Sequence, residues 1–573
     1  MTRSDRWSIL TLVGLGVGVP LLLGVASGAI LVSHNDDFNY RRVALGLYET
    51  GHIQLTGWTV MSLVGQLALV MPFLWVSQGA AWAFAAMTAL VAMIGIGASY
   101  LLVRRVLAPF RSFLAVLTVL VFPGFLLNTT SFMTDVPAYS GEVVCLLLGA
   151  TALQREGADR WRWLIASFAV GLFAFSVREF ALAAPVAVLV SAAASATDRR
   201  SRYVIAGAVL LAACGALYYV TSHLPGQGTT ALAPLSLAGV PRMLTAVTTL
   251  TFGLSPAIII GAAWWVPRTN LPETIAGAVA GIALFGGSVL AVVSGPGVPT
   301  QFIGNLLTRE GAPGTGALAG GRPILFDSPW WEAMNLLALV AAILGMAILW
   351  GVLGLAIRQR ASIGRGALAR GLGSVTGLLV IFVVIFAGGL VAFGLVASMF
   401  DRYLWPLALP LAALLMLQPR WATQMAARSW RVPTVVSAGA AGIATAVLAT
   451  SSLVLLLNSD AFDAARWRIG DDAVKAGFAA NTVDAGMEWV GYHATGIANI
   501  HANARPGEMW YSAWWSSFHQ CAIVSASLLD IPGFRLESAR IDAYRLLLFD
   551  GPESPLYLYR VPGPGCPSSP SQP

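Results

Sequence analysis

The sequence predicts an α-helical polytopic membrane protein that ends in a small extracytoplasmic α/β domain. The 573 residues are 57% hydrophobic and only 11% charged, and their mean hydropathy is +0.74. Soluble domains carry about 25% charged residues. Apolar runs of about 20 residues recur along the chain, unlike the short alternating segments of a membrane β-barrel. The runs stop near residue 457, and the net charge changes there from basic to acidic.

Thirteen apolar runs are candidates for membrane helices, and together they predict about 13 transmembrane helices in residues 1–457. The runs at 112–127, 162–176 and 404–417 are short for a full crossing. The other ten lie at 8–32, 80–103, 136–153, 180–196, 203–222, 243–266, 273–293, 333–357, 374–398 and 433–457.

The arginines set the orientation of these runs. With the N-terminus in the cytoplasm, alternating loops place 19 arginines inside and seven outside, as the positive-inside rule expects. A crossing by the apolar run 59–76 would move Arg104 and Arg105 outside, so we expect that run to lie in or dip into the outer interface. An odd number of spans then places residues 458–573 outside the plasma membrane.

Residues 458–573 are predicted to form one extracytoplasmic domain. A helix is expected at 462–478, and strands are expected at 509–515, 546–549 and 556–561. Four tryptophans of this domain are assigned to its core, although such rings also stack on sugars: Trp489, Trp510, Trp514 and Trp515.

The four cysteines fall into two pairs. Cys145 and Cys214 lie in apolar runs, and we expect both to be buried. Cys521 and Cys566 lie in the outside domain, a compartment that permits disulfides. The sequence leaves open whether these two cysteines are bridged or free.

Carboxylates gather on the predicted outer face. Asp36 and Asp37 directly follow the first helix, and Asp135 leads into the helix at 136–153. Adjacent residues point in different directions, so one carboxylate of the first pair can face a reaction centre while the other holds Arg41 or a metal. The structural alternatives are a solvated loop with local ion pairs for Asp36 and Asp37, and helix capping for Asp135.

Basic side chains reach the same face from three later segments. Arg178 lies between two apolar runs, and Arg402 and Tyr403 begin a short helix that contains Pro406. The long Gly- and Pro-rich loop 294–332 carries two more arginines that could bind an anion: Arg309 and Arg322.

Taken in order, these motifs resemble the GT-C glycosyltransferases, and most closely the branch of the protein mannosyltransferases and aminoarabinose transferases. The matching features are an acidic pair after the first helix, an Asp before a Pro, a basic residue at the membrane boundary and a late Arg-Tyr-x-x-Pro segment. One feature departs from the branch, because residues 55–59 (Leu-Thr-Gly-Trp-Thr) lack the basic residue and proline that many relatives carry there. The resemblance covers residues 1–457, which it makes a GT-C-like catalytic domain.

The resemblance implies transfer of a sugar from a polyprenyl-phosphate donor, with inversion, at the outer membrane face. Asp36, Asp37 and Asp135 would then be catalytic, with Asp36 as the general base. Arg178, Arg402 and Tyr403, together with Arg309 and Arg322, would bind the donor phosphate. Asp37 and Asp135 are candidate ligands for a divalent cation, Mg or Mn.

The expected partners are therefore the lipid-linked sugar, membrane lipid and a glycan, lipid or protein acceptor, in a bacterial plasma membrane. We expect no nucleic-acid partner. A lipid or glycan transporter or flippase, which predicts internal repeats and a midplane site, remains an alternative. So does a non-catalytic subunit of cell-envelope assembly, which would tolerate loss of Asp36 and Asp135.

Overall fold

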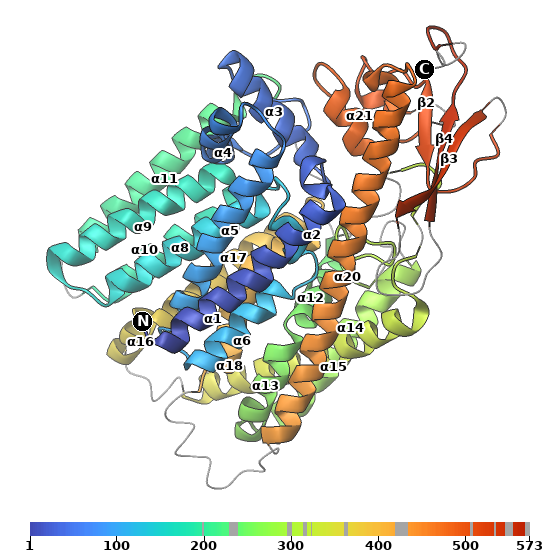
Figure 1. The fold of residues 1–573 in the computed structure, drawn as a ribbon. Helices are drawn as coiled ribbons and strands as arrows, with labels where there is room; N and C mark the ends of the chain where they lie inside the picture. Colours follow the sequence, from blue (N-terminus) through green and yellow to red (C-terminus); the bar gives the residue numbers. More distant parts are fainter. Residues whose placement is uncertain are drawn as a thin grey trace.

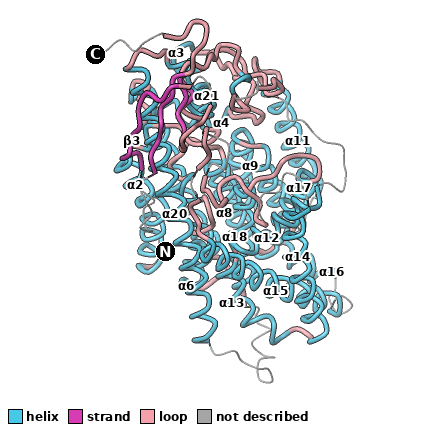
Figure 2. Tube along the Cα trace, turned by 90° about the vertical axis from the view of Figure 1, so that its right-hand side faces the viewer, coloured by secondary structure: helices cyan, strands magenta, loops and turns pink. Residues whose placement is uncertain are grey.

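The computed structural model describes residues 1–196, 200–228, 239–294, 301–312, 318–322, 324–359, 365–418, 434–504, 508–531, 534–544 and 554–567. Helices make up most of the molecule, with a small sheet at one end (Figures 1 and 2). This arrangement confirms the predicted fold class.

The helices divide into those of the first half and those of the second half. In the first half they are α1 (Arg3–Val13), α2 (Val19–Ser27), α3 (Asp37–Thr50), α4 (Val64–Ser77), α5 (Trp82–Val103), α6 (Pro109–Leu120), α7 (Phe125–Asn128), α8 (Asp135–Leu153), α9 (Gly157–Val177), α10 (Ala183–Ala194) and α11 (Arg200–Ser222). In the second half they are α12 (Val240–Gly253), α13 (Ser255–Trp265), α14 (Leu271–Ser294), α15 (Ser328–Gln359), α16 (Arg365–Leu372), α17 (Val375–Gly394), α18 (Trp405–Met416), α20 (Thr434–Lys475) and α21 (Met487–His493).

Each of the thirteen apolar runs contains helix, but the exact number of crossings stays a prediction. Within the described residues, eight helical segments are long and apolar enough to cross a membrane, or nine if α12 and α13 form one span. The run at 243–266 is not one straight helix as expected, because α12 and α13 meet at 78°. Pro256 stands at the start of α13, where it cannot continue the hydrogen bonding of α12.

The apolar segment 59–76 forms α4, which has only 14 residues. At about 1.5 Å per residue, such a helix is shorter than the ~30 Å hydrocarbon core. Its length therefore suits the predicted interfacial position, which remains a prediction.

Close helix packing holds the interior together. Gly95 of α5 faces α8 so closely that a Cβ atom there would lie 2.2 Å from Ser140 Oγ. Small residues allow membrane helices to approach in this way. Glycine at this position therefore helps to fix α8, the helix that carries Asp135 at its first residue.

The C-terminal region is built on the far end of α20. Its four strands, in the order β1-β2-β4-β3, are β1 (Val483–Asp484), β2 (Ala522–Ser525), β3 (Arg535–Tyr544) and β4 (Ser554–Arg560). β1 and β2 are parallel, and the other neighbouring pairs are antiparallel. Phe462 and Trp467 of α20 pack in the core beneath the sheet. The domain boundary predicted after residue 457 thus lies inside α20.

Two of the four elements predicted for this region are present in the structure. The helix at 462–478 is part of α20, and the strand at 556–561 corresponds to β4. The strand expected at 509–515 is wrong, since that segment contains a 3-10 helix (Ser512–Trp514). Trp514 packs inward, as expected, whereas Trp510, which was also assigned to the core, is 47% exposed. The strand expected at 546–549 lies outside the described residues.

Cys521 and Cys566 form a disulfide, whereas Cys145 and Cys214 are free and buried.

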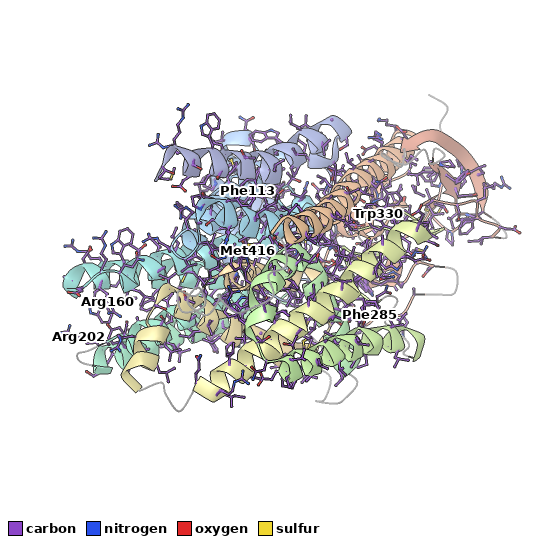
Figure 3. All side chains as sticks on the ribbon, turned by 90° about the horizontal axis from the view of Figure 1, so that it is seen from below. Phe113, Arg160, Arg202, Phe285, Trp330 and Met416 are labelled. Atoms are coloured by element: carbon purple, nitrogen blue, oxygen red, sulfur yellow. A yellow bond between two sulfur atoms is a disulfide. The ribbon has the colours of Figure 1, made fainter. Side chains whose placement is uncertain are left out.

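The two ends of the molecule differ in the elements that they carry. Figure 1 shows α3, α21 and the strands at one end, and the N-terminus and α16 toward the other. Seen from below, Arg160 of α9 and Arg202 of α11 lie near each other (Figure 3), and the Arg160 guanidinium is 5.6 Å from the ring centroid of Tyr203. These two arginines, both assigned to the cytoplasm, thus lie together, away from the C-terminal sheet.

Candidate active site

Asp36 stands immediately before α3, so the start of this helix fixes its position. Its backbone carbonyl accepts the N–H of Asn39 (3.1 Å). Its side chain has a hydrogen-bond donor on each oxygen: Trp58 Nε1 is 3.2 Å from Oδ1, and Arg402 Nη2 is 2.8 Å from Oδ2. Asp36 is thus an ionic partner of a residue 366 positions later in the chain.

Asp37 points away from Asp36 and organises the loop. Its Oδ1 accepts the backbone N–H of His34 (2.8 Å). Its Oδ2 accepts the backbone N–H of Phe132 (3.1 Å) and one N–H of Arg41 (3.2 Å). Asp37 is fully buried. It ties the Asp36 loop to the segment before α8, which matches the expectation that one carboxylate of the pair would hold Arg41.

Arg402 lies in a short 3-10 helix (Asp401–Leu404) before α18 and is surrounded by acceptors. Besides binding Asp36, it donates from Nη1 to Asn305 Oδ1 (2.7 Å). Its Nε lies 3.6 Å from Asp135 Oδ2. One guanidinium therefore joins the two carboxylates that the sequence placed in separate segments.

Arg178 completes the ion cluster from the end of α9. Its Nη1 is 2.5 Å from Asp135 Oδ1 and 3.1 Å from Thr134 Oγ1. Its guanidinium lies 4.5 Å from the ring centroid of Tyr403. We call Asp36, Asp135, Arg178 and Arg402 the catalytic cluster.

The catalytic cluster is formally neutral, and its members differ in exposure. The side chains of Arg402, Asp135 and Arg178 are 3%, 4% and 8% exposed, whereas Asp36 is 15% exposed. Burial disfavours the charge of Arg402, but Asp135 and Asp36 outweigh that effect and raise the pKa of its guanidinium. Asp36 is therefore the member most open to an approaching molecule, while both arginines stay charged.

Two further side chains of the site were missed by the sequence argument. Tyr40 is buried, and its pKa lies well above its usual value because of burial and the nearby charge of Asp36. Its spacing of four residues from Asp36 places both on one face of a helix, a signal that could have identified it. Asn305 accepts from Arg402 and from Asn35 Nδ2 (2.8 Å), and nothing in the surrounding Gly-rich loop indicated this contact.

Asp401 positions Arg402 through backbone contacts. Its Oδ2 accepts the backbone N–H groups of Leu306 (2.9 Å) and Leu307 (2.7 Å), and its Oδ1 accepts the N–H of Arg402 (2.8 Å). Burial raises the pKa of Asp401 to about 6, against the lowering effect of these N–H donors. Asp401 thus fixes the Asn305 loop against the segment that carries Arg402.

The two loop arginines lie apart from the catalytic cluster. Arg309 donates to Ser328 Oγ (3.3 Å). Arg322 donates to the carbonyl of Ala312 and lies 3.8 Å from the ring centroid of Phe462 in α20. The structure therefore brings Arg178, Arg402 and Tyr403 together with Asp36 and Asp135, but it does not bring Arg309 or Arg322 into this group.

A small cavity and an apolar groove adjoin the catalytic cluster. The cavity is lined by three members of the cluster, all except Asp36, and deeper in the helix bundle by Tyr139, Glu142 and Pro406. The groove, of about 230 Å³, runs between the start of α10 and α17, where Val186 and Ile385 line it. Cavity and groove share two walls, Phe180 and Phe386. An apolar surface thus leads to a pair of guanidinium groups.

The arrangement does not fit a divalent cation at Asp37 and Asp135. Three N–H donors already occupy the Asp37 carboxylate. Asp135 faces Arg178 and Arg402, and two guanidinium charges repel a metal ion. His519, Cys521 and Cys566 are the single cluster of possible metal ligands in the described part of the chain, but both sulfurs belong to the disulfide.

Comparison with known proteins supports the class that the sequence predicts. A family model, dolichyl-phosphate-mannose-protein mannosyltransferase, matches residues 67–225. This match covers 159 of the 573 residues and agrees with the resemblance to the GT-C glycosyltransferases that the sequence predicts. No curated protein matches it.

Some solved structures are similar to this chain at low identity. ArnT from Cupriavidus metallidurans, bound to undecaprenyl phosphate, is 14% identical with a TM-score of 0.40, and the alignment covers 84% of each chain. The oligosaccharyltransferase of Archaeoglobus fulgidus, in complex with Zn and sulfate, is 13% identical with a TM-score of 0.38, over 91% of this chain and 68% of the other. At this level of similarity, the roles of individual residues rest on the contacts within this chain.

Proposed function

We propose that the enzyme transfers a sugar from a polyprenyl-phosphate donor to an acceptor hydroxyl at the outer face of the plasma membrane, with inversion. The observation that carries this proposal is the catalytic cluster, which combines a partly exposed carboxylate with two buried guanidinium groups. A carboxylate can accept the proton of the acceptor, and guanidinium groups stabilise a departing phosphate.

The groove suits the lipid part of the donor. Its walls are apolar except for Glu179, whose carboxylate accepts the backbone N–H of Ser62 (2.7 Å), and it meets the cavity of the catalytic cluster at Phe180 and Phe386. A polyprenyl chain lying in the groove would place its phosphate near Arg178. The guanidinium of Arg178 uses Nη1 for Asp135 and Thr134, and its planar fork offers further N–H donors for phosphate oxygens.

The chemistry is a single displacement. The oxygen of the acceptor hydroxyl attacks the anomeric carbon from the side opposite the phosphate, and Asp36 takes the proton of that hydroxyl. The bond between that carbon and the phosphate oxygen breaks, and its electron pair stays on the lipid phosphate. Arg178 and Arg402 stabilise the charge that develops there. One displacement inverts the anomeric centre, in contrast to the two-step reaction of a retaining glycosidase.

Donor binding also prepares the base. Before the donor binds, Arg402 is paired with Asp36 at 2.8 Å. A donor phosphate next to Arg402 competes for the same N–H group, because phosphate and carboxylate bind the guanidinium fork in the same way. Asp36 then loses its cationic partner and becomes a stronger base at the moment when the donor is in place.

No divalent cation is needed in this scheme. Arg178 and Arg402 supply the positive charge that a metal would otherwise provide. Asp135 holds the two guanidinium groups side by side, through contacts of 2.5 Å to Arg178 and 3.6 Å to Arg402. Asp135 is in this scheme a positioning residue, and Asp36 is the residue that touches the acceptor.

The placement of the site supports the acceptor class and the compartment of this proposal. Asp36 directly precedes α3, which lies with α21 and the sheet at one end of the molecule (Figure 1), and the arginine distribution assigns that end to the outside. The acceptor is therefore an extracytoplasmic glycan, lipid or protein.

The test compares cell-envelope glycans by mass spectrometry in a strain that lacks the gene. Deletion should lower the mass of one glycan by a single sugar unit, and the wild-type gene should restore that unit. The Asp36→Asn gene should not restore it, although the variant protein accumulates in the membrane. Unchanged glycans after deletion would overturn the proposal. So would full restoration by Asp36→Asn combined with Asp135→Asn.

A further inference from the structure

Residues 55–59 are held between two distant parts of the chain. Leu55 and Gly57 donate backbone hydrogen bonds to the carbonyls of Pro225 and Gly226 (2.8 Å each). On the other side, the carbonyl of Thr56 accepts the N–H of Ala498 in the C-terminal region (2.7 Å). Gly57 has φ +83°, and a Cβ atom there would lie 2.5 Å from the Ala498 carbonyl oxygen. After Trp58, the carbonyl of Thr59 accepts the N–H of Gly228 (2.8 Å), so the backbone is fixed on both sides of Trp58.

Trp58 uses this fixed position to reach Asp36. Its indole N–H donates to Asp36 Oδ1 (3.2 Å), the oxygen that Arg402 does not bind. Its ring lies against Trp514 of the C-terminal region, with centroids 4.7 Å apart and planes tilted by 32°. Trp58 thus connects the proposed base to a residue more than 450 positions later in the chain.

Trp514 is itself held firmly. It is 7% exposed, and its carbonyl accepts the N–H of Asn499 (2.7 Å), next to the residue that binds Thr56. Its neighbour Trp515 packs edge-on against Phe38 of α3, with ring centroids 6.1 Å apart. A tryptophan anchored on both sides restricts the rotamer of the ring that lies on it.

We propose that the C-terminal region builds the acceptor side of the active site, because Trp514 clamps Trp58 and the Trp58 indole fixes Oδ1 of Asp36. This inference rests on the proposed function. The donor phosphate competes for Arg402 on the Oδ2 side, so the acceptor hydroxyl meets Asp36 from the side that Trp58 borders. Once Arg402 turns to the phosphate, the Trp58 N–H is the remaining side-chain donor that keeps the carboxylate in its reactive orientation. Trp58 is therefore a positioning residue.

The test replaces Trp58 in the full-length enzyme, in nanodiscs, by 3-benzothienylalanine, which keeps the shape of the ring and replaces N–H by sulfur. Loss of one hydrogen bond to a charged group should lower kcat about tenfold. The KM for the polyprenyl-phosphate sugar should stay within about twofold of wild type, because the donor side is untouched. The matched control places the same analogue at Trp330, whose indole donates to Ser451 Oγ (3.1 Å) in another part of the molecule, and its kcat should not change.

Substitution of Trp514 provides a second test. Trp514→Leu should lower kcat in the same direction, and combining it with the Trp58 analogue should cost little more than either change alone, since both act through one contact. Trp514→Phe keeps an aromatic ring at this position and should restore most of the activity, which guards against a simple folding defect.

Two outcomes separate this inference from the proposed function. If the Trp58 analogue retains wild-type kcat while Asp36→Asn is inactive in the same assay, the inference is wrong and the proposed function stands. If Asp36→Asn is as active as wild type, the proposed function itself is wrong.

Discussion

Two groups of buried charges lie close together at the same end of the molecule, yet only one of them has the properties of an active site. The first is the catalytic cluster. The second, which we call the buried network, consists of His34, Asp463, Arg466 and Glu488. His34 Nδ1 is 2.7 Å from Asp463 Oδ2, and Arg466 is 2.9 Å from both Asp463 and Glu488. The two groups are similar in composition and differ in access.

The difference in access has a direct physical consequence. The side chains of Asp463, Arg466 and Glu488 are at most 2% exposed. Three members of the catalytic cluster line a cavity, and its fourth member, Asp36, is 15% exposed. Burial of paired charge alone is thus a feature of stable cores as well as of active sites. We expect changes in the catalytic cluster to reduce activity and changes in the buried network to reduce stability.

The largest effect is expected for Asp36→Asn. The amide keeps the size of the side chain but cannot take the acceptor proton, so kcat should fall by ~10²–10⁴. The thermal unfolding midpoint should stay close to that of wild type. Steady-state transfer in nanodiscs measures the first quantity and differential scanning fluorimetry the second; a large loss of stability would instead place Asp36 with the buried network.

Arg178→Ala should come next in its effect on activity. Removing a preorganised cation from the leaving group costs about 10²–10³ in kcat, and the KM for the lipid donor should rise as well. Arg178→Lys should recover part of the loss, because it retains the charge without the planar fork. A normal donor KM in Arg178→Ala would remove this arginine from the phosphate site.

Substitution in the buried network should show the opposite pattern. Asp463→Asn leaves His34 and Arg466 without their shared carboxylate, and breaking a buried ion pair costs about 3–5 kcal/mol. The unfolding midpoint should drop, while the fraction that remains folded should keep a normal donor KM. A variant with wild-type stability and reduced kcat would show that the network takes part in the reaction.

A smaller effect is expected from pH, acting through His34. Both ring nitrogens face acceptors, Asp463 and the carbonyl of Ala29. Burial alone would lower the pKa of His34, but the hydrogen bond and charge of Asp463 raise it to about 9 from the ordinary 6.5. The protonated ring therefore stabilises the fold fully below pH 6.5, and this contribution is lost as pH rises through 9.

The thermal unfolding midpoint of the wild type should decrease as the pH rises from 6.5 to 9 and beyond. His34→Gln should have a lower midpoint at pH 6 and a weaker decrease over the same range. Parallel curves for the two proteins would mean that His34 does not titrate in this window.

The smallest effect is expected from metal removal. Two guanidinium groups contact Asp135, and N–H donors occupy Asp37, so EDTA should leave the transfer rate unchanged within about twofold. Loss of activity in EDTA with recovery on addition of Mg²⁺ or Mn²⁺ would reject the metal-independent scheme.

The sequence predicted the parts of this comparison that depend on local position. Asp36 and Asp135 stand at the ends of helices, and the arginine count put those ends on one face, which is where the structure brings their side chains together. Asp37 could not be separated from Asp36 by sequence alone, because its inward direction depends on the backbone N–H of Phe132, which is distant in the chain. The same limit applies to Arg309 and Arg322, which lie in a loop without periodicity.

Long-range packing also explains the missed elements. Trp514 was assigned to the core of the C-terminal region, and it is buried, but its neighbour there is Trp58 of the membrane domain. Residues 55–59 stood out in the sequence only for lacking a basic residue and a proline. The short strand β2 was missed because its four residues gain their pairing from β1 and β4 and carry little periodic signal of their own.

Binding of undecaprenyl phosphate tests the central claim most directly, because this lipid matches the proposed leaving group and lacks the sugar. Its affinity for the protein in nanodiscs can be measured by the ligand-dependent rise of the unfolding midpoint. Asp36 competes with the phosphate for Arg402, so Asp36→Asn should bind this lipid at least as tightly as wild type while being inactive in transfer. Arg178→Ala should bind it at least tenfold more weakly. Equal affinity in all three proteins would contradict the account, because the phosphate would then lie outside the catalytic cluster.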